Sequence, residues 1–227
     1  MLILISIVFT VIGMILSGTL RSKFSRYSKV PLTNGMSGAD VAANMLRHYG
    51  IQDVQVIHVE GQLTDHYNPA TKTVNLSQDV FHGRNVAAAA VAAHECGHAV
   101  QHATAYSMLQ LRLALVPIVN VAASLQQYLF MMALVGMSMF NNQYILLVVL
   151  IVFGITCFFS LVTLPVEFDA SRRALAWLDS SGVAARGEQY DGAKDALFWA
   201  AMTYVAAALA ALLQFVYLLM KFLGNRE

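Results

Sequence analysis

The sequence predicts a mainly α integral membrane protein with four transmembrane helices and a small α+β region. Hydrophobic residues make up 58% of the 227 residues and charged residues only 12%, a balance typical of membrane proteins. Four long apolar runs hold most of the hydrophobic residues, and polar segments separate them. The net charge is only +1 and no basic run is present, so we expect no nucleic-acid partner.

The four apolar runs are each long enough to cross a bilayer. Residues 1–20 are followed, rather than preceded, by basic residues, which predicts a retained anchor instead of a cleaved signal peptide. The other predicted spans are residues 113–137, 144–164 and 200–219. Four polar residues interrupt the second span, and we expect them to face other helices rather than lipid: Asn120, Ser124, Gln126 and Gln127.

The positions of Lys and Arg predict the orientation in the membrane. A short loop at residues 138–143 would make the second and third spans a hairpin, which puts regions 21–112 and 165–198 on one side. These two regions hold twelve of the fourteen Lys and Arg residues, as cytoplasmic loops do. We therefore expect a multi-pass protein of the inner (plasma) membrane, with both regions in the cytoplasm and the lipid bilayer as a partner.

Region 21–112 predicts a small α+β fold ahead of a long helix. Ser37 can cap a short helix that ends near Gly50. Residues 54–60 are rich in β-branched side chains, and residues 62–67 and 72–76 flank a turn, which predicts a strand and a hairpin. The hairpin could offer its edge to an extended peptide or simply cover the following helix, and the sequence does not decide between these. That helix is predicted over residues 86–102, with Asn85 as its cap.

The helix over residues 86–102 contains the strongest functional signal, an H-E-x-x-H motif at His94 to His98. Residues four apart share a helix face and are separated by about 6 Å along the axis. His94 and His98 can therefore bind one Zn²⁺, and Glu95 can act as general base on a metal-bound water. The alternative is a pair of merely packed or solvated histidines. Glu95 argues against it, since a lone carboxylate in an apolar run needs a partner such as a metal ion.

A third ligand must come from elsewhere in the chain. His102 continues the four-residue spacing, but it lies about 12 Å along the helix from His94, too far for Zn–N bonds of about 2 Å. Glu167 follows the third span on the predicted side and would complete a His₂Glu, gluzincin-like site with one position open for water. From the residues alone, Glu167 and Asp169 could instead be acids in the first turn of a helix that begins at Pro165. Asp169 is the second choice of ligand.

Four segments together resemble the YugP-type membrane zinc metallopeptidases, also called neutral zinc metallopeptidase family 2. They are residues 63–69 (LTDHYNP), 75–77 (NLS), 92–102 (AAHECGHAVQH) and 164–174 (LPVEFDASRRA). The resemblance runs over most of the chain and implies an endopeptidase. A wider kinship with HtpX-like peptidases, which pair H-E-x-x-H with a downstream E-x-x-x-D, puts Glu167 at the ligand position. It puts Ser171 where those peptidases have aspartate, so the group that steadies the histidines stays open, with Asp169 one candidate.

The order of the elements predicts where the chain must bend. Glu167 is two residues past Pro165, which places the zinc within about 10 Å of the membrane surface. A straight helix from His98 to Leu113 would instead hold it more than about 20 Å away. We therefore expect a bend between residues 103 and 112, in preference to a third span that continues outward as one long helix.

These observations predict a membrane-embedded zinc metallopeptidase with a zincin-like catalytic region. His94, His98 and Glu167 would bind Zn²⁺ and Glu95 would be catalytic. Peptides or membrane proteins near the cytoplasmic surface would be the substrates, with membrane protein quality control as one role. The alternative is a membrane scaffold or partner protein with a structural zinc site. A metal-ion transporter is disfavoured, because no predicted span carries Asp, Glu or His. Small residues in 206–211 would permit a homo-oligomer or a membrane partner protein, but cleavage preference and the oxyanion-stabilising residue do not follow from the sequence.

Overall fold

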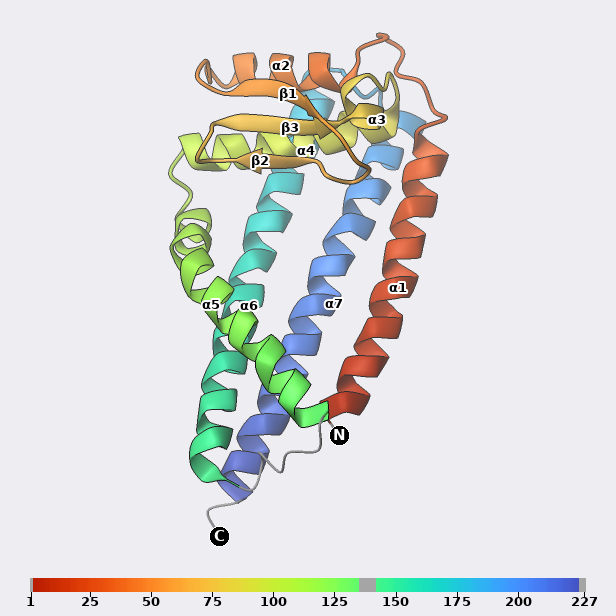
Figure 1. The fold of residues 1–227 in the computed structure, drawn as a ribbon. Coiled ribbons are helices and arrows are strands. Elements are labelled where there is room, and N and C mark those ends of the chain that lie inside the picture. Colours follow the sequence, from red (N-terminus) through yellow and green to blue (C-terminus); the bar gives the residue numbers. More distant parts are fainter. Residues whose placement is uncertain (1, 135–141, 225–227) are drawn as a thin grey trace. The chain divides into compact units, whose positions relative to one another are not determined.

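The computed structural model describes residues 2–134 and 142–224, which are mainly helical with one small sheet (Figure 1). This confirms the predicted class of a mainly α protein with a short sheet. The helices are α1 (Leu2–Tyr27), α2 (Gly38–His48), α3 (Gln78–Phe81), α4 (Val86–Ala103), α5 (Ser107–Leu134), α6 (Gln143–Ser180) and α7 (Glu188–Gly224), and the strands are β1 (Gln55–Val59), β2 (His66–Asn68) and β3 (Thr73–Ser77).

The chain divides into two compact units. Unit 1 consists of Met1–Ile15, Gln110–Leu164 and Thr203–Glu227, and unit 2 consists of Leu16–Leu109 and Pro165–Met202. Helices α1, α5, α6 and α7 each contribute to both units. The sheet, α2, α3 and α4 belong to unit 2 alone.

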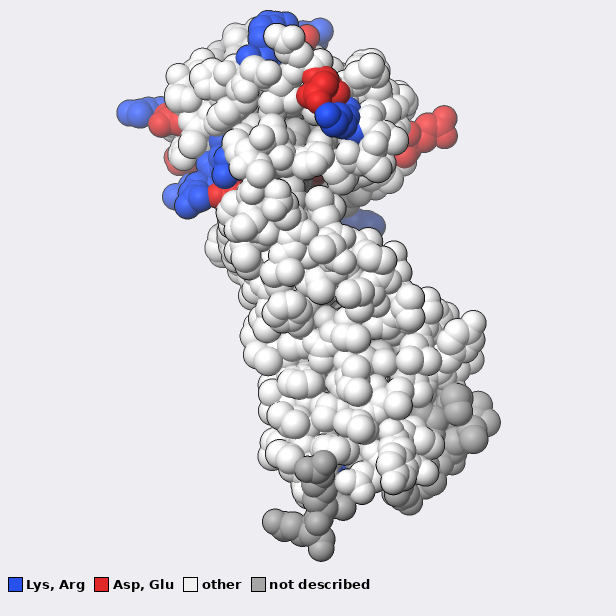
Figure 2. Space-filling view, turned by 90° about the vertical axis from the view of Figure 1, so that its left-hand side faces the viewer, with Lys and Arg blue, Asp and Glu red and all other residues white. Residues whose placement is uncertain are grey.

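Unit 1 is made from apolar helices. In the described part of the chain, Leu2–Tyr27, Ser107–Leu129, Gln143–Ser180 and Glu188–Gly224 are each long and apolar enough to cross a membrane, which agrees with the four predicted spans. The end of the second predicted span and most of the predicted loop at 138–143 lie outside the described residues. Buried Leu146, Val149 and Phe153 of α6 pack with Leu218 and Phe222 of α7. The sequence of unit 1 contains no acidic residue before the C-terminal Glu227. Figure 2 shows the corresponding surface as a wide expanse with almost no Lys, Arg, Asp or Glu.

The polar residues of α5 differ from the prediction. Gln126 does face another helix, because its Oε1 accepts a hydrogen bond of 3.3 Å from Thr156 Oγ1 of α6. The other three, Asn120, Ser124 and Gln127, are exposed in the single chain. Buried Ala122 lies on the same face as Gln126, and helical spacing puts the exposed residues on the opposite face. The presence of polar residues in the predicted span therefore did not show which face of α5 packs against another helix.

The link between α4 and α6 also departs from the prediction in one respect. As expected, the chain bends after α4, which ends at Ala103, and Ala105 takes a positive φ of 52° before α5 begins at Ser107. The bend was preferred over a third span that continues as one long helix, but the structure has both. The expectation that a new helix begins at Pro165 is wrong, because α6 continues from Gln143 through Pro165 to Ser180. Proline removes one backbone donor from the helix. The helix nevertheless continues because four fully buried residues at four-residue spacing pack beyond that point: Val166, Ala170, Ala174 and Leu178.

Unit 2 builds a three-stranded sheet against α4. The strand order is β1-β3-β2, with β1 parallel and β2 antiparallel to β3. The predicted hairpin is thus confirmed, with Tyr67 opposite Val74. Helix α4 packs against α2, α3, β2 and β3. Its alanines from Ala87 to Ala99 and Cys96 are buried with Val41 and Met45 of α2, so the helix that carries the H-E-x-x-H motif forms the centre of the unit.

The beginnings of both buried helices follow the sequence signals. Asn85 Oδ1 accepts a hydrogen bond of 2.9 Å from Ala88 N at the start of α4. Ser37 and Asp40 form a capping box at the start of α2, where each side chain bonds the backbone N–H of the other. The hydrogen bonds from Ser37 lower the pKa of Asp40, and the charge of Arg84 adds to this effect. The Asn85 cap fixes the start of α4, and the capping box fixes the start of α2.

Candidate metal centre

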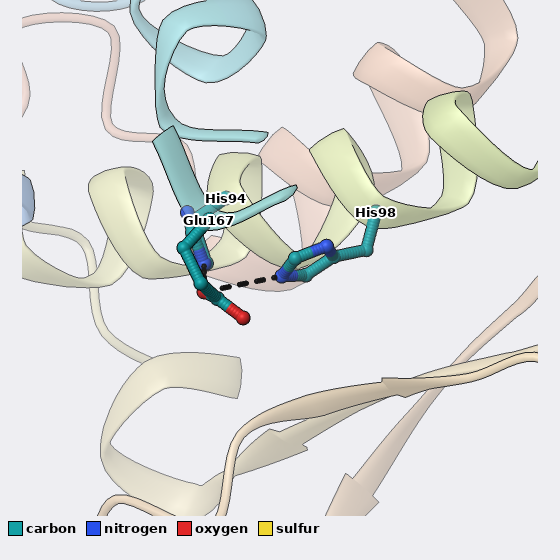
Figure 3. A group of neighbouring side chains, drawn as sticks. All are labelled: His94, His98 and Glu167. Atoms are coloured by element: carbon teal, nitrogen blue, oxygen red, sulfur yellow. Dashed lines mark ion pairs between the residues drawn. The ribbon is translucent and has the colours of Figure 1, made fainter. Parts of the chain in front are cut away.

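Three side chains from two helices of unit 2 meet in one place. His94 and His98 are one turn apart on α4, and their ring centroids are 4.8 Å apart. Glu167 reaches them from α6, with Oε2 at 3.3 Å from His94 Nε2 and 3.6 Å from His98 Nε2 (Figure 3). The side chains are 14%, 11% and 3% exposed, respectively. Of the described residues, these form the one group of three His, Cys, Asp or Glu that could hold a metal ion.

The donor set fits zinc by its spacing and by its chemistry. Zn–N and Zn–O bonds of about 2.0–2.1 Å at tetrahedral angles separate neighbouring ligand atoms by about 3.3–3.4 Å. The two distances from Glu167 Oε2 are 3.3 and 3.6 Å, close to that separation, and all three ligand atoms lie within 4.8 Å of one another. Two imidazoles and one carboxylate are also ligands that zinc accepts, and three of them leave one position open. Cys96 is no competitor: it is fully buried, its Sγ lies against Ala42 O at 3.6 Å, and burial raises the pKa of its thiol.

The second ring nitrogen of each histidine has its own partner. Ser171 Oγ lies 3.1 Å from His94 Nδ1, and Gln101 Oε1 lies 3.0 Å from His98 Nδ1. Both Nε2 atoms are therefore left to face Glu167. Burial lowers the pKa of His98, but its hydrogen bond to Glu167 and the charge of Glu95 outweigh this, so the pKa lies above its ordinary value.

Glu95 is fixed by the neighbouring strand. Its carboxylate is buried, with the residue 8% exposed, and its Oε2 accepts a hydrogen bond of 2.9 Å from Tyr67 N of β2. The Tyr67 hydroxyl in turn lies 2.8 Å from His102 Nδ1, and burial raises the pKa of this phenol. His102 thus contacts the strand that holds Glu95 and does not join the group formed by His94, His98 and Glu167.

A glycine lets the two ligand-bearing helices approach each other closely. A Cβ at Gly97, inside the H-E-x-x-H motif, would lie 2.6 Å from Ala170 O of α6, a distance that real Cβ atoms do not reach. Ala170 is one turn beyond Glu167. The absence of a side chain at Gly97 therefore brings Glu167 within reach of the two histidines.

Sequence reasoning missed two supporting contacts. Gln101 was not singled out, although it lies three residues after His98, a spacing at which helical side chains meet. Asp169, a candidate for steadying the histidines, contacts neither of them. Its Oδ2 accepts a hydrogen bond of 3.0 Å from Gln101 Nε2 and another from Arg173. The residue at the aspartate position, Ser171, makes the contact with His94 itself, and the E-x-x-x-D spacing was the signal that marked it.

Comparison with known proteins places this site in a family context. Residues 2–223 match the model of a family described as "Putative neutral zinc metallopeptidase". A relative described as "Putative membrane protease YugP", from Bacillus subtilis (strain 168), is 41% identical over 207 residues, which cover 91% of this chain and 90% of the relative. No solved structure matches the chain.

Proposed function

Because the chain belongs to the neutral zinc metallopeptidase family, we propose that it is a membrane-embedded endopeptidase that uses zinc to hydrolyse peptide bonds. The observation that carries this proposal is the meeting of His94, His98 and Glu167 at ligand spacing. A carboxylate, Glu95, lies next to the first histidine in the same motif. A zinc family, a zinc-compatible donor set and an adjacent base together support peptide hydrolysis.

His94, His98 and Glu167 are the proposed zinc ligands. When bound there, zinc supplies a Lewis acid that lowers the pKa of a water toward 7 and polarises the scissile carbonyl. Ser171 and Gln101 hold the imidazoles with Nε2 toward Glu167, which is how protein groups commonly orient zinc-binding histidines. Three ligands, rather than four, favour a catalytic over a structural site.

Glu95 is the proposed general base. Its Oε2 is anchored on Tyr67 N, which leaves Oε1 to accept a proton from the attacking water. The carboxylic acid so formed gives the proton to the leaving amine, while the water oxygen bonds to the carbonyl carbon and the C–N bond breaks. A structural zinc site would have no need for this carboxylate, which argues against a scaffold protein.

The proposed substrates are peptides or membrane proteins beside the bilayer, with the active site in the cytoplasm and a role in membrane protein quality control. Four helices long enough to cross a membrane and the bias of Lys and Arg toward regions 21–112 and 165–198 support this location. Equal cleavage rates on soluble unfolded casein and on membrane-protein substrates would contradict the substrate proposal.

The decisive experiment compares purified protein with the Glu95→Gln variant. We expect zinc-dependent cleavage by the wild type, with internal cleavage sites identified by mass spectrometry of the products. In Glu95→Gln, cleavage should fall by about 10²- to 10⁴-fold, the usual contribution of a general base, while bound zinc is unchanged. Full activity in this variant would refute the assignment. A wild type that binds zinc but cleaves nothing would favour the scaffold alternative.

A further inference from the structure

We infer that Gln101 is the positioning residue of the metal centre: its single amide group fixes which nitrogen of His98 carries hydrogen and ties that histidine to Glu167. The inference rests on the proposed zinc site. Gln101 is fully buried, with 0% of its surface exposed. A neutral amide buried this completely costs free energy unless its donors and its oxygen are hydrogen-bonded. Its three contacts use both N–H donors and one of the two acceptor positions of the oxygen.

The orientation of the amide is fixed by its two acceptors. Gln101 Nε2 lies 2.7 Å from Val166 O and 3.0 Å from Asp169 Oδ2. Both partners can only accept hydrogen bonds, because one is a carbonyl and the other a carboxylate that is paired with Arg172 and Arg173. A flipped amide would place its oxygen against these two oxygens. The NH₂ group must therefore face α6 and the carbonyl oxygen must face His98.

This orientation determines the tautomer of His98. Gln101 Oε1 can only accept, so His98 Nδ1, at 3.0 Å, must donate. A neutral imidazole carries one hydrogen, and with that hydrogen on Nδ1 the lone pair lies on Nε2. Nε2 is the atom that faces Glu167 at 3.6 Å (Figure 3). The amide thus selects the form of His98 that can bind a metal ion from this side.

The same amide positions the third ligand. Val166 precedes Glu167 directly, so the hydrogen bond from Gln101 to Val166 O holds the turn of α6 from which Glu167 projects. Asp169, two residues further on, gives a second attachment on that turn. One side chain of α4 therefore sets both His98 and the backbone that presents Glu167.

His94 lacks an equivalent constraint. Its partner Ser171 has a hydroxyl that can either donate or accept, so the contact at 3.1 Å is compatible with either tautomer. The two histidines of the motif therefore differ. The hydrogen bonds of Gln101, each with a fixed donor and acceptor, set the tautomer of His98, whereas the contact with Ser171 does not set the tautomer of His94.

The test measures how fast zinc is lost to a chelator. Wild-type protein is first shown to bind zinc, and release is then followed after addition of excess chelator. Because partners that orient metal-binding histidines contribute about 10- to 100-fold to metal affinity, Gln101→Met should release zinc faster by about that factor. Cys96→Ala is the matched control, since Cys96 is on the same helix and fully buried but contacts no ligand, and its release rate should equal that of the wild type.

The outcomes separate this inference from the proposed function. If wild-type protein binds no zinc, the proposed function and this inference both fail. If the wild type binds zinc and Gln101→Met releases it as slowly as Cys96→Ala, the proposed function stands and Gln101 only fills space. Faster release from Gln101→Met alone supports the inference.

A second pair of variants tests the direction of the hydrogen bonds and replaces the first if Gln101→Met does not fold. In Gln101→Glu, one carboxylate oxygen can still accept from His98, but the other meets Val166 O and Asp169 Oδ2, so zinc release should be fast. Adding Asp169→Asn supplies an amide that can donate to the new oxygen, so the double variant should release zinc more slowly than Gln101→Glu. A role limited to packing predicts no such recovery. If the double variant releases zinc as fast as Gln101→Glu, the inference is overturned.

Discussion

The two units of the molecule bury different kinds of side chain. The core of unit 1 is apolar, with Leu146 and Leu218 fully buried, and Thr163 is the one buried polar side chain among its described residues. Unit 2 instead buries Glu95, His98 and several further polar groups around one place: Gln101, Glu167, Asp169 and Ser171. Burying a charged group costs several kcal/mol unless it is paired. Polar burial in this protein is therefore concentrated where a metal site needs it.

The contacts between helices differ in the same way. In unit 2, α4 and α6 are joined by interactions of the buried charged residues Glu167 and Asp169. In unit 1, isolated neutral hydrogen bonds join the helices, such as Gln214 Nε2 to Ser6 Oγ at 3.1 Å. We infer that substitutions in unit 2 act on the metal site, whereas substitutions of equal size in unit 1 change stability slightly and leave the chemistry intact.

The largest expected effect is that of Glu167→Ala. This change removes a proposed ligand and the acid that faces both histidines, so bound zinc should fall to background and cleavage with it. The loss of zinc affinity should be larger than the loss caused by removing a group that only supports a ligand, which is about 10- to 100-fold. Zinc content and cleavage rate would be measured on the same preparation. Thr163→Val, one turn earlier in the same helix and also buried, should retain both, and equal losses in the two variants would contradict the contrast between the units.

Gly97→Ala should have the next largest effect. The added Cβ would lie 2.6 Å from Ala170 O, so α4 and α6 must separate, and overpacking of this kind costs about 1–3 kcal/mol. We expect a lower unfolding temperature in detergent together with faster zinc release. Gly13→Ala is the matched control in unit 1, because no atom lies within 4 Å of a Cβ there. Alanine favours helix by about 0.8–1.0 kcal/mol over glycine, so this control should be unchanged or slightly more stable.

Local patterns predicted much of the fold and part of the site. Four-residue spacing within one helix placed His94 and His98 together, and the turn at residues 68–71 predicted the hairpin. These inferences succeed because each depends on neighbours in the chain. Glu167 was different, since from the residues alone it could have been a simple first-turn acid. The resemblance of residues 164–174 to the peptidase family singled out Glu167. Its distances of 3.3 and 3.6 Å to the histidines support it as a proposed ligand.

The features that sequence reasoning missed depend on packing between distant segments. Pro165 is a usual sign of a helix start. Helix α6 nevertheless continues past it, because the face from Val166 to Leu178 is buried and packed. The exposed side of α5 could not be told from its composition, because the face that packs depends on where α6 lies. Gln101 looked like one polar residue in an alanine-rich helix, and its role follows only from the approach of Val166 and Asp169, far along the chain.

Substitutions at Ser171 should change zinc binding less than those at Gln101. Ser171→Ala removes the hydroxyl from His94 Nδ1 and should speed zinc release, by less than Gln101→Met because the hydroxyl does not fix the tautomer. Ser171→Asp supplies the carboxylate of the E-x-x-x-D pattern. Hydrogen bonds to charged groups are about twice as strong as neutral ones, so this variant should release zinc more slowly than the wild type. Release rates in the opposite order would show that Ser171 does not support His94.

The smallest effect is expected from Gln214→Leu in unit 1. The change removes the hydrogen bond between Gln214 Nε2 and Ser6 Oγ, but Ser6 Oγ keeps its own donor bond to Leu2 O at 3.1 Å, so no buried donor is left unsatisfied. Polar contacts between membrane helices contribute about 0.6 kcal/mol on average, which should lower the unfolding temperature only slightly. Zinc release and cleavage should match the wild type, because no contact of the metal centre changes. A marked loss of zinc from this variant would mean that the apolar helices of unit 1 do more than anchor the protein, and the contrast between the units would fail.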